Sequence, residues 1–185
     1  MSAVVAGGGR ALAVWVLLAA VPLGAAASDL NGFAGTWVRD AREHDDAARN
    51  AMIVRATEPM SFAFRGFARG VMRKRMVPIE RYVVEQGAGA PQIRNDKGVV
   101  FPLDGQAHVT GENREVTSRL SERGEIEQSW KVGSDSQGTT VWRLEGDGRL
   151  VVSQRVYDPH FAEPLEYSTT YRRLDRDPTE TANPR

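Results

Sequence analysis

The sequence predicts a mainly β fold, namely an up-and-down antiparallel barrel of about ten strands with a two-helix insert after the first strand. A short aromatic and β-branched segment near the start is followed by two segments whose apolar residues have helical spacing. Beyond Pro78 the apolar residues alternate with polar ones, and turn sequences recur at short intervals. One face of the alternating segments stays apolar, which favours a closed barrel because closure removes exposed strand edges. An open curved sheet is the alternative.

This chain of 185 residues has 24 basic and 24 acidic side chains and no cysteine. Its length suits one domain with a single core. The balanced charge argues against general affinity for nucleic acid, which depends on neutralising many phosphates. Without cysteine the chain forms no disulfide and carries no lipid-modified cysteine, so the core alone must stabilise the fold. We expect a monomer without a cofactor.

The first 27 residues have the pattern of a secretory signal peptide. Arg10 precedes an uncharged run over residues 11–23, and small residues follow up to Ala27. A helix of that run extends about 20 Å, which is short of the roughly 30 Å hydrocarbon core that a membrane anchor must cross. We therefore expect cleavage after Ala27 and export to the periplasm or the cell exterior. The barrel domain is then predicted over residues 28–174, followed by a flexible tail over 175–185.

The predicted helical insert occupies about residues 41–76. Aromatic and β-branched residues over 33–39 predict the strand that precedes it. The stretch from Asp40 to about Ala56 is rich in Ala, Arg and acids, which predicts the first helix. Asp45 and Asp46 suit its beginning, because carboxylates favour the positive end of a helix.

A second amphipathic helix is predicted to follow and to end before Pro78. Its apolar stripe consists of Met60, Phe64, Phe67 and Val71. The same segment carries five positive charges and no acid, namely Arg65, Arg69, Arg73, Lys74 and Arg75. We expect the stripe to pack on the barrel mouth as a lid, because an amphipathic helix in a globular domain normally buries its apolar side. The alternative is peripheral contact of this helix with an anionic membrane surface.

Nine further strands are separated by turns rich in Gly, Asp and Asn. They are predicted at residues 79–86, 91–94, 99–103, 107–110, 115–120, 125–132, 139–144, 150–157 and 166–173. Three polar residues, Ser118, Gln128 and Gln154, occupy positions whose parity points them to the apolar side. Buried polar groups require partners, which a ligand or ordered water in a cavity would provide. A register slip or a local bulge is the alternative explanation.

The order of these elements resembles the calycin superfamily, the lipocalins and fatty-acid-binding proteins. It is also similar to exported bacterial proteins described as lipocalin-like. The matching segments are Gly35-Thr36-Trp37, Asp45-Asp46, the basic segment over 65–75, residues 101–105 and Tyr171-Arg172-Arg173. The resemblance implies an apolar ligand that enters the barrel past the helices, and a tryptophan, here Trp37, that closes the barrel floor.

One departure from the fatty-acid-binding pattern concerns the ligand carboxylate. Those proteins commonly hold it with an arginine two residues before a tyrosine of the last strand. Here Tyr171 matches the tyrosine, but Thr169 stands at the arginine position. The residues that we expect to contact a ligand are Phe64, Phe67, Ser118, Gln128, Trp130, Trp142, Gln154 and Tyr171.

The sequence contains no recognisable catalytic or metal-binding arrangement. Three consecutive residues of a helix point in different directions, so His44-Asp45-Asp46 lacks the spacing of a chelating pair. Glu125 and Glu127 share the polar face of a strand, where solvent is the expected partner. The leading expectation is an exported carrier of an apolar or amphipathic, lipid-like molecule. A membrane-surface or protein-interaction module with a filled barrel is second, and a cavity enzyme of isomerase or cyclase type is third.

Overall fold

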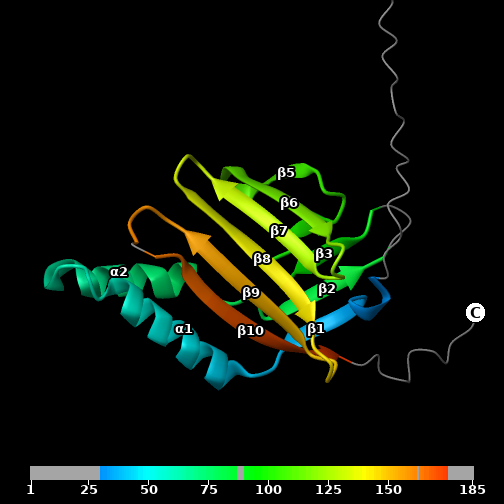
Figure 1. Ribbon diagram of the computed structural model, residues 1–185, viewed down its shortest axis with the longest axis horizontal. Coiled ribbons are helices and arrows are strands. Elements are labelled where there is room, and N and C mark those ends of the chain that lie inside the picture. The colour runs from blue at the N-terminus through cyan, green and yellow to red at the C-terminus, as the bar shows by residue number, and fades with distance from the viewer. Residues whose placement is uncertain (1–29, 87–89, 162, 175–185) are drawn as a thin grey trace, which may run out of the picture.

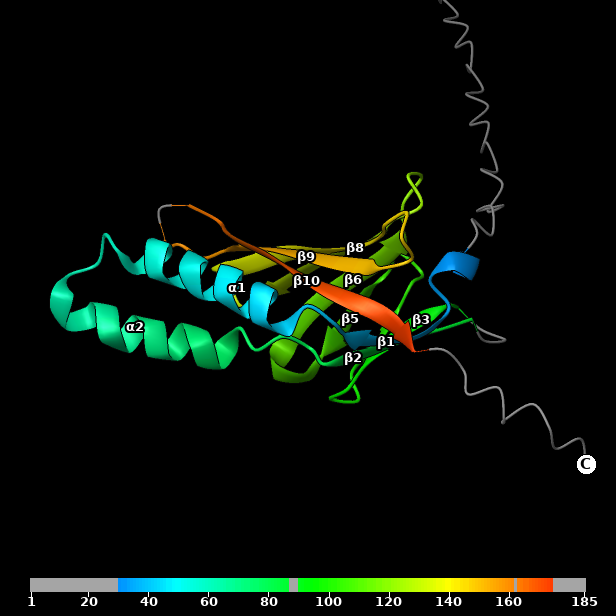
Figure 2. The ribbon, with the colours of Figure 1, turned by 90° about the horizontal axis from the view of Figure 1, so that it is seen from below.

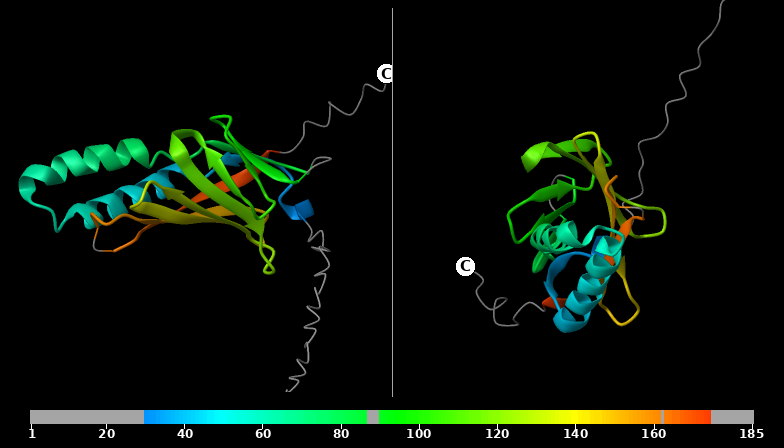
Figure 3. Two further views of the ribbon diagram at one scale, coloured as in Figure 1. Left: turned by 90° about the horizontal axis from the view of Figure 1, so that it is seen from above. Right: turned by 90° about the vertical axis from the view of Figure 1, so that its left-hand side faces the viewer.

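The structure is a computed structural model that describes residues 30–86, 90–161 and 163–174. The predicted signal peptide and C-terminal tail lie outside the described residues. The predicted fold class is confirmed, because ten antiparallel strands form one sheet that curves into a nearly closed barrel (Figures 1 and 3). Two helices follow the first strand, as expected. This architecture is compatible with a calycin-like fold.

The elements agree with the predicted ones to within a few residues. Their bounds are β1 (Gly35–Arg39), α1 (Arg42–Thr57), α2 (Phe62–Arg75), β2 (Arg81–Glu85), β3 (Gln92–Asn95), β4 (Val100–Pro102), β5 (Ala107–Thr110), β6 (Arg114–Leu120), β7 (Ile126–Val132), β8 (Ser136–Leu144), β9 (Leu150–Tyr157) and β10 (Leu165–Leu174). Two 3-10 turns occur at Leu30–Gly32 and Gly111–Asn113. β8 begins three residues earlier than predicted because Ser136, Gln137 and Gly138 continue the ladder with β7.

The strand order around the barrel is β4-β3-β2-β1-β10-β9-β8-β7-β6-β5. The first strand therefore lies between β2 and the last strand, β10. At the seam, β4 contacts β6, and the Gly105 N–H donates to the Ser118 carbonyl oxygen at 2.9 Å. This contact brings β4, at one end of the sheet, against β6, which is next to the strand at the other end.

Large aromatic side chains fill one end of the barrel. Trp37, Tyr82, Trp142 and Tyr171 are buried there with aliphatic residues of the neighbouring strands. The Tyr82 ring meets Trp142 edge-on at 5.9 Å and lies 5.2 Å from Tyr171, between ring centroids. The Trp37 indole N–H donates to the Phe33 carbonyl oxygen at 2.7 Å. Trp37 is therefore part of this aromatic floor of the barrel, and its buried polar atom has a partner.

The other end of the barrel carries the helices (Figure 2). Because β1 ends at Arg39, the first half of β10 has no strand beside it on that edge, and α1 packs there. The Asp45 carboxylate accepts the Thr170 N–H at 2.7 Å. An unpaired backbone N–H at a covered edge is costly, so α1 supplies a side-chain acceptor where the ladder stops. Asp45 thus serves the sheet edge as well as the helix start.

Arg39, the last residue of β1, joins three elements. Its side chain is 4% exposed and contacts Asp46 of α1 at 2.6 Å and Glu80, just before β2, at 3.3 Å. Arg49 also pairs with Asp46 at 2.7 Å, and Arg42 pairs with Glu80 at 2.9 Å. A buried charge that loses its partner is strongly destabilising. This ion-pair cluster therefore fixes α1 against β1 and the approach to β2.

The lid prediction for the second helix is wrong. Phe64 and Phe67 are 68% and 74% exposed, whereas α2 turns Arg65, Arg69 and Met72 toward the rest of the protein. Both helices project together beyond the strands (Figures 2 and 3). Neither of these described helices has the length and apolar character needed to cross a bilayer.

Hydrogen bonds explain this rotation of α2. Arg65 donates to the carbonyl oxygens of Glu58 at 2.7 Å and Met60 at 3.1 Å, at the end of α1 and in the turn. The Arg69 Nε–H donates to the Thr57 hydroxyl oxygen at 2.9 Å. The turn and the C-terminal end of α1 thus obtain donors for exposed carbonyl groups, which draws the arginine side of α2 inward.

A second apolar cluster joins the helices to the barrel. It consists of Met52, Ile53, Met72 and Leu165, with Ala56, Met76, Val156, Phe161 and Tyr167 packed around them. Met72 is the buried residue of α2. The base of the helical hairpin is therefore packed, while its tip extends into solvent.

Asp46→Asn tests the ion-pair cluster. Partial burial acts to raise the pKa of Asp46, but the hydrogen bond from Arg39 and the charge of Arg49 outweigh it and hold that pKa below its usual range. Such a carboxylate stabilises the folded state above its unfolded pKa of about 4, and the stabilisation is lost as the pH falls through the lower folded pKa. We expect Asp46→Asn to lower the free energy of unfolding by about 1–2 kcal/mol at pH 7. The effect is limited to this size because the carboxylate is partly exposed and water screens its ion pairs.

Urea denaturation at pH 7, 5 and 3 measures this difference, which we expect to shrink below pH 4. The exposed turn residue Asp135 provides the control substitution Asp135→Asn. A difference between Asp46→Asn and the unsubstituted chain that stays constant over this pH range would contradict the assignment.

Candidate functional site

A row of polar side chains crosses the barrel interior on five neighbouring strands. Ser118, Gln128, Thr140, Gln154 and Tyr167 lie directly opposite one another in the ladders from β6 to β10. The register is continuous through all five positions, so the bulge considered above does not occur there. Ser118 is 1% exposed and Gln128 is 7% exposed, which confirms the inward direction predicted from parity.

Two hydrogen bonds pair four members of this polar row. The Gln128 amide donates to the Ser118 hydroxyl oxygen at 3.0 Å. The Tyr167 hydroxyl donates to the Gln154 amide oxygen at 2.7 Å. Thr140 stands between the two pairs and makes no side-chain hydrogen bond with a described residue. The middle of the row therefore has an unused hydroxyl group.

An unused donor lies next to that hydroxyl. Trp142 follows Thr140 by two residues on β8, so its side chain points to the same interior, one step toward the aromatic floor. Trp142 is 1% exposed, and its indole N–H has no partner among the described residues. A buried donor without an acceptor costs about 1–3 kcal/mol. The boundary between the floor and the polar row therefore favours a bound group that accepts a hydrogen bond.

Trp130 lies on the helix side of the polar row, above a glycine. It stands opposite Gly138, and a Cβ atom added there would lie 2.5 Å from the Trp130 ring and 2.6 Å from the Arg155 carbonyl oxygen. The Arg114 guanidinium lies 5.0 Å from the centre of the Trp130 ring. Gly138 thus leaves the space that the indole ring fills.

Positive charge is concentrated at the helix end of the row. Burial raises the pKa of Tyr167 to about 12, although the charges of Arg49 and Arg114 act in the opposite direction. Arg49 comes from α1 and Arg114 from β6, so two elements direct positive charge toward one interior hydroxyl. Burial likewise raises the pKa of Tyr82 and Tyr171, which therefore remain neutral at physiological pH.

The structure brings together six of the eight predicted ligand-contacting residues. The barrel interior contains Ser118, Gln128, Trp130, Trp142, Gln154 and Tyr171. Tyr171 belongs to the floor, where its hydroxyl donates to the Ile79 carbonyl oxygen at 2.7 Å. Phe64 and Phe67 lie outside the barrel, on the exposed side of α2. They were expected inside because their spacing was assumed to mark the buried face of the helix.

Sequence reasoning missed four interior or rim residues. Parity alone would have found Thr140 and Tyr167, since they share faces with Trp142 and Tyr171. Arg114 is one residue before the predicted start of its strand, so its direction was not considered. Arg49 is close to Tyr167 only through the packing of α1 on β10, which no local pattern indicates.

The carboxylates of Glu125 and Glu127 face away from the interior. Glu125 and Glu127 pair with Arg143 and Arg119 on the outer face of the barrel, rather than with solvent alone. The described residues include no group of three or more side chains that could hold a metal ion. Asp45 and Asp46 have the structural contacts given above, and His44 is exposed.

Two further histidines have acidic partners at the surface. His108 lies 2.9 Å from Asp104, and His160 lies 2.7 Å from Asp158, both between a ring nitrogen and a carboxylate oxygen. A backbone hydrogen bond from Gln106 is the main cause that lowers the pKa of Asp104. Each pair closes a local turn, and neither reaches the barrel interior.

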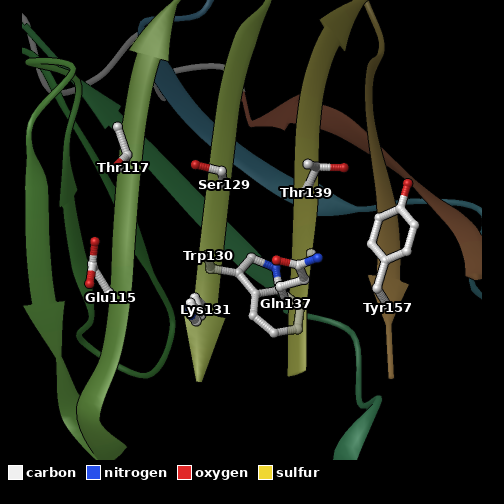
Figure 4. A pocket seen from close by; sticks show the side chains of 9 residues that line it. Glu115, Thr117, Ser129, Trp130, Lys131, Gln137, Thr139 and Tyr157 are labelled. Atoms are coloured by element: carbon white, nitrogen blue, oxygen red, sulfur yellow. The ribbon is translucent and has the colours of Figure 1, made fainter. Parts of the chain in front are cut away.

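Two open hollows occur on the outside of the barrel. The larger, of about 450 Å³, lies over the outer faces of β6, β7 and β8, where it is lined by polar side chains such as Glu115, Ser129 and Gln137 (Figure 4). The other, of about 280 Å³, lies beside the segment that joins β9 to β10, near Tyr157 and Phe161.

No protein-family model and no curated protein sequence matches this chain. The interpretation of the site therefore depends on its geometry.

The contact between Trp130 and Gly138 can be tested by Gly138→Ala. The added methyl group meets a backbone carbonyl oxygen, which cannot move away without disturbing the ladder. We expect a loss of about 1–3 kcal/mol in the free energy of unfolding and a changed tryptophan emission spectrum. Gly146→Ala is the control, because no atom lies within 4 Å of the added group there. Equal effects of the two substitutions in urea denaturation would contradict the packing described.

Proposed function

We propose that this chain is an exported binding protein that holds an amphipathic, lipid-like small molecule in its β-barrel. The observation that carries the proposal is the buried polar row in an otherwise apolar interior. Ligand sites combine an apolar lining with a few polar groups that fix orientation. The resemblance of the sequence to lipocalins and fatty-acid-binding proteins supports the same conclusion, and the pattern of residues 1–27 supports export.

The polar group of the ligand is placed at the middle of the row. There it accepts a hydrogen bond from the Trp142 indole N–H and exchanges one with the Thr140 hydroxyl. The charges of Arg49 and Arg114 act at the helix end of the row, near Tyr167. The apolar part contacts Val116, which is buried beside the row, and burial of its surface contributes about 25 cal/mol per Å².

The ligand is proposed to enter beside α2, between the helices and the barrel end. α2 is held there through Met72 and the partly buried Met76, and methionine side chains repack easily around an inserted group. We propose binding rather than catalysis, because the carboxylates of the strands that form the row, such as Glu125 and Glu127, face outward.

A matched pair of substitutions on β8 tests the interior site. Thr140 faces the interior and Thr139 faces outward, so Thr140→Val and Thr139→Val make the same chemical change on opposite faces. Titration with cis-parinaric acid, a fluorescent fatty acid, measures binding to each variant. We expect one probe per chain, about fivefold weaker affinity for Thr140→Val, and no change for Thr139→Val, because one hydrogen bond contributes about 1 kcal/mol.

Valine has the shape of threonine, so both variants are expected to fold, which circular dichroism checks. Absence of saturable binding to the unsubstituted chain, or equal affinity for both variants, contradicts an interior site.

Export is tested separately by intact mass measurement of the protein recovered from the periplasm or the culture medium. The expected mass corresponds to a chain that begins at Ser28. Recovery only inside the cell, with residues 1–27 retained, contradicts export.

A further inference from the structure

Three phenylalanine side chains are exposed on the protruding helix α2. Phe62, Phe64 and Phe67 are 91%, 68% and 74% exposed. Isolated apolar residues are common on surfaces, but Phe64 and Phe67 lie three residues apart on one side of the helix and form an exposed aromatic patch of the kind that marks an interaction site. Phe62, two residues before Phe64, lies on another side of the same turn. Phe64 and Phe67 belong to the first half of α2, which follows the turn between the helices. That turn lies at the end of the hairpin away from the strands (Figure 2).

The same helix is cationic, and its cations have different roles. Arg65 and Arg69 hold α2 to the end of α1 through the hydrogen bonds described above. Arg73, Lys74 and Arg75 are exposed in the last turn, and α2 contains no acidic residue. These three side chains therefore add positive charge to the exposed surface of the helix.

Helical spacing places two of these cations beside the aromatic patch. Phe64, Phe67 and Val71 follow one another at steps of three and four, and Lys74 and Arg75 continue the same side three and four residues after Val71. Lys74 lies about 10 Å from Phe67 along the helix axis, at 1.5 Å per residue. The aromatic rings are thus nearer the tip, and the charges are nearer the barrel.

We propose that the tip of the α1–α2 hairpin docks on an anionic lipid bilayer. The phenylalanine rings enter the boundary between headgroups and acyl chains, and Lys74 and Arg75 contact lipid phosphates. Apolar faces of interfacial helices penetrate about 5–10 Å into this boundary, while cationic side chains of the same helix stay near the headgroups. Charge complementarity selects an anionic membrane over a neutral one. This inference concerns the outer surface of α2 and does not depend on a ligand inside the barrel.

Co-sedimentation with vesicles tests the proposal on the chain over residues 28–185. The vesicles contain either phosphatidylcholine alone or a mixture of phosphatidylcholine and phosphatidylglycerol at a molar ratio of about 7:3, in about 0.1 M salt, where surface charges still act over about 10 Å. We expect binding to the anionic vesicles, at least tenfold weaker binding to the neutral ones, and a clear loss of binding in about 0.5 M salt.

Two double substitutions separate the contributions of rings and charges. Phe64→Ser with Phe67→Ser is expected to weaken partitioning into anionic vesicles at least tenfold, because two apolar side chains no longer leave water. Lys74→Glu with Arg75→Glu is expected to weaken it at least twentyfold, since each charge at an anionic surface changes affinity about fivefold. All four positions are exposed, so unchanged thermal unfolding is expected.

Matched controls lie on the barrel. Val109 is 75% exposed on β5, and Val109→Ser removes an exposed apolar side chain elsewhere. Lys97→Glu with Lys131→Glu makes the same change in total charge at exposed positions away from α2. Both controls are expected to retain binding within about twofold, the size of effect that neutral surface substitutions cause.

Three results would overturn the proposal. The first is no binding of the unsubstituted chain to anionic vesicles, and the second is equal loss of binding in the α2 and control variants. The third is a concentration-dependent dimer, without vesicle binding, that Phe64→Ser with Phe67→Ser abolishes. That result would assign the aromatic patch to contact between two copies of this chain.

Discussion

The early end of β1 is the constraint on which the rest of the molecule depends. A strand of five residues beside one of ten leaves backbone groups of β10 without a neighbour. α1 covers that edge, and the Asp45 carboxylate supplies an acceptor for the Thr170 N–H. The buried Arg39 then joins β1 to α1 through Asp46, and to the segment that precedes β2 through Glu80. The position of the whole helical hairpin follows from this junction.

The barrel interior has two regions with different physical roles. The floor around Trp37 and Trp142 is packed by aromatic rings, which stabilise the fold through burial and edge contacts. The polar row above it holds buried side chains, and the indole N–H of the adjacent Trp142 has no partner among the described residues. A fold that needed only stability would gain from apolar residues at these positions. The incomplete pairing is therefore the feature that most favours a binding role.

Strand alternation predicted much of this structure, because side-chain period and sheet face are linked by local geometry. The inward direction of Ser118, Gln128 and Gln154 could be predicted from the alternation of side chains along their three strands. The orientation of α2 could not be predicted in the same way. Hydropathy treats Arg65 and Arg69 as solvent-facing, whereas their guanidinium groups satisfy backbone and hydroxyl oxygens at the end of α1 and in the turn.

Pairing of β1 with β10 has a consequence for the order of folding. The N-terminal strand completes its second ladder only when residues 171–174 have been synthesised. The chain between β1 and β10 must close into a long loop before these strands can pair. The entropy cost of closing the loop comes before the stabilising contacts form, so such topologies fold slowly. The nascent chain therefore cannot complete the barrel until its last strand emerges.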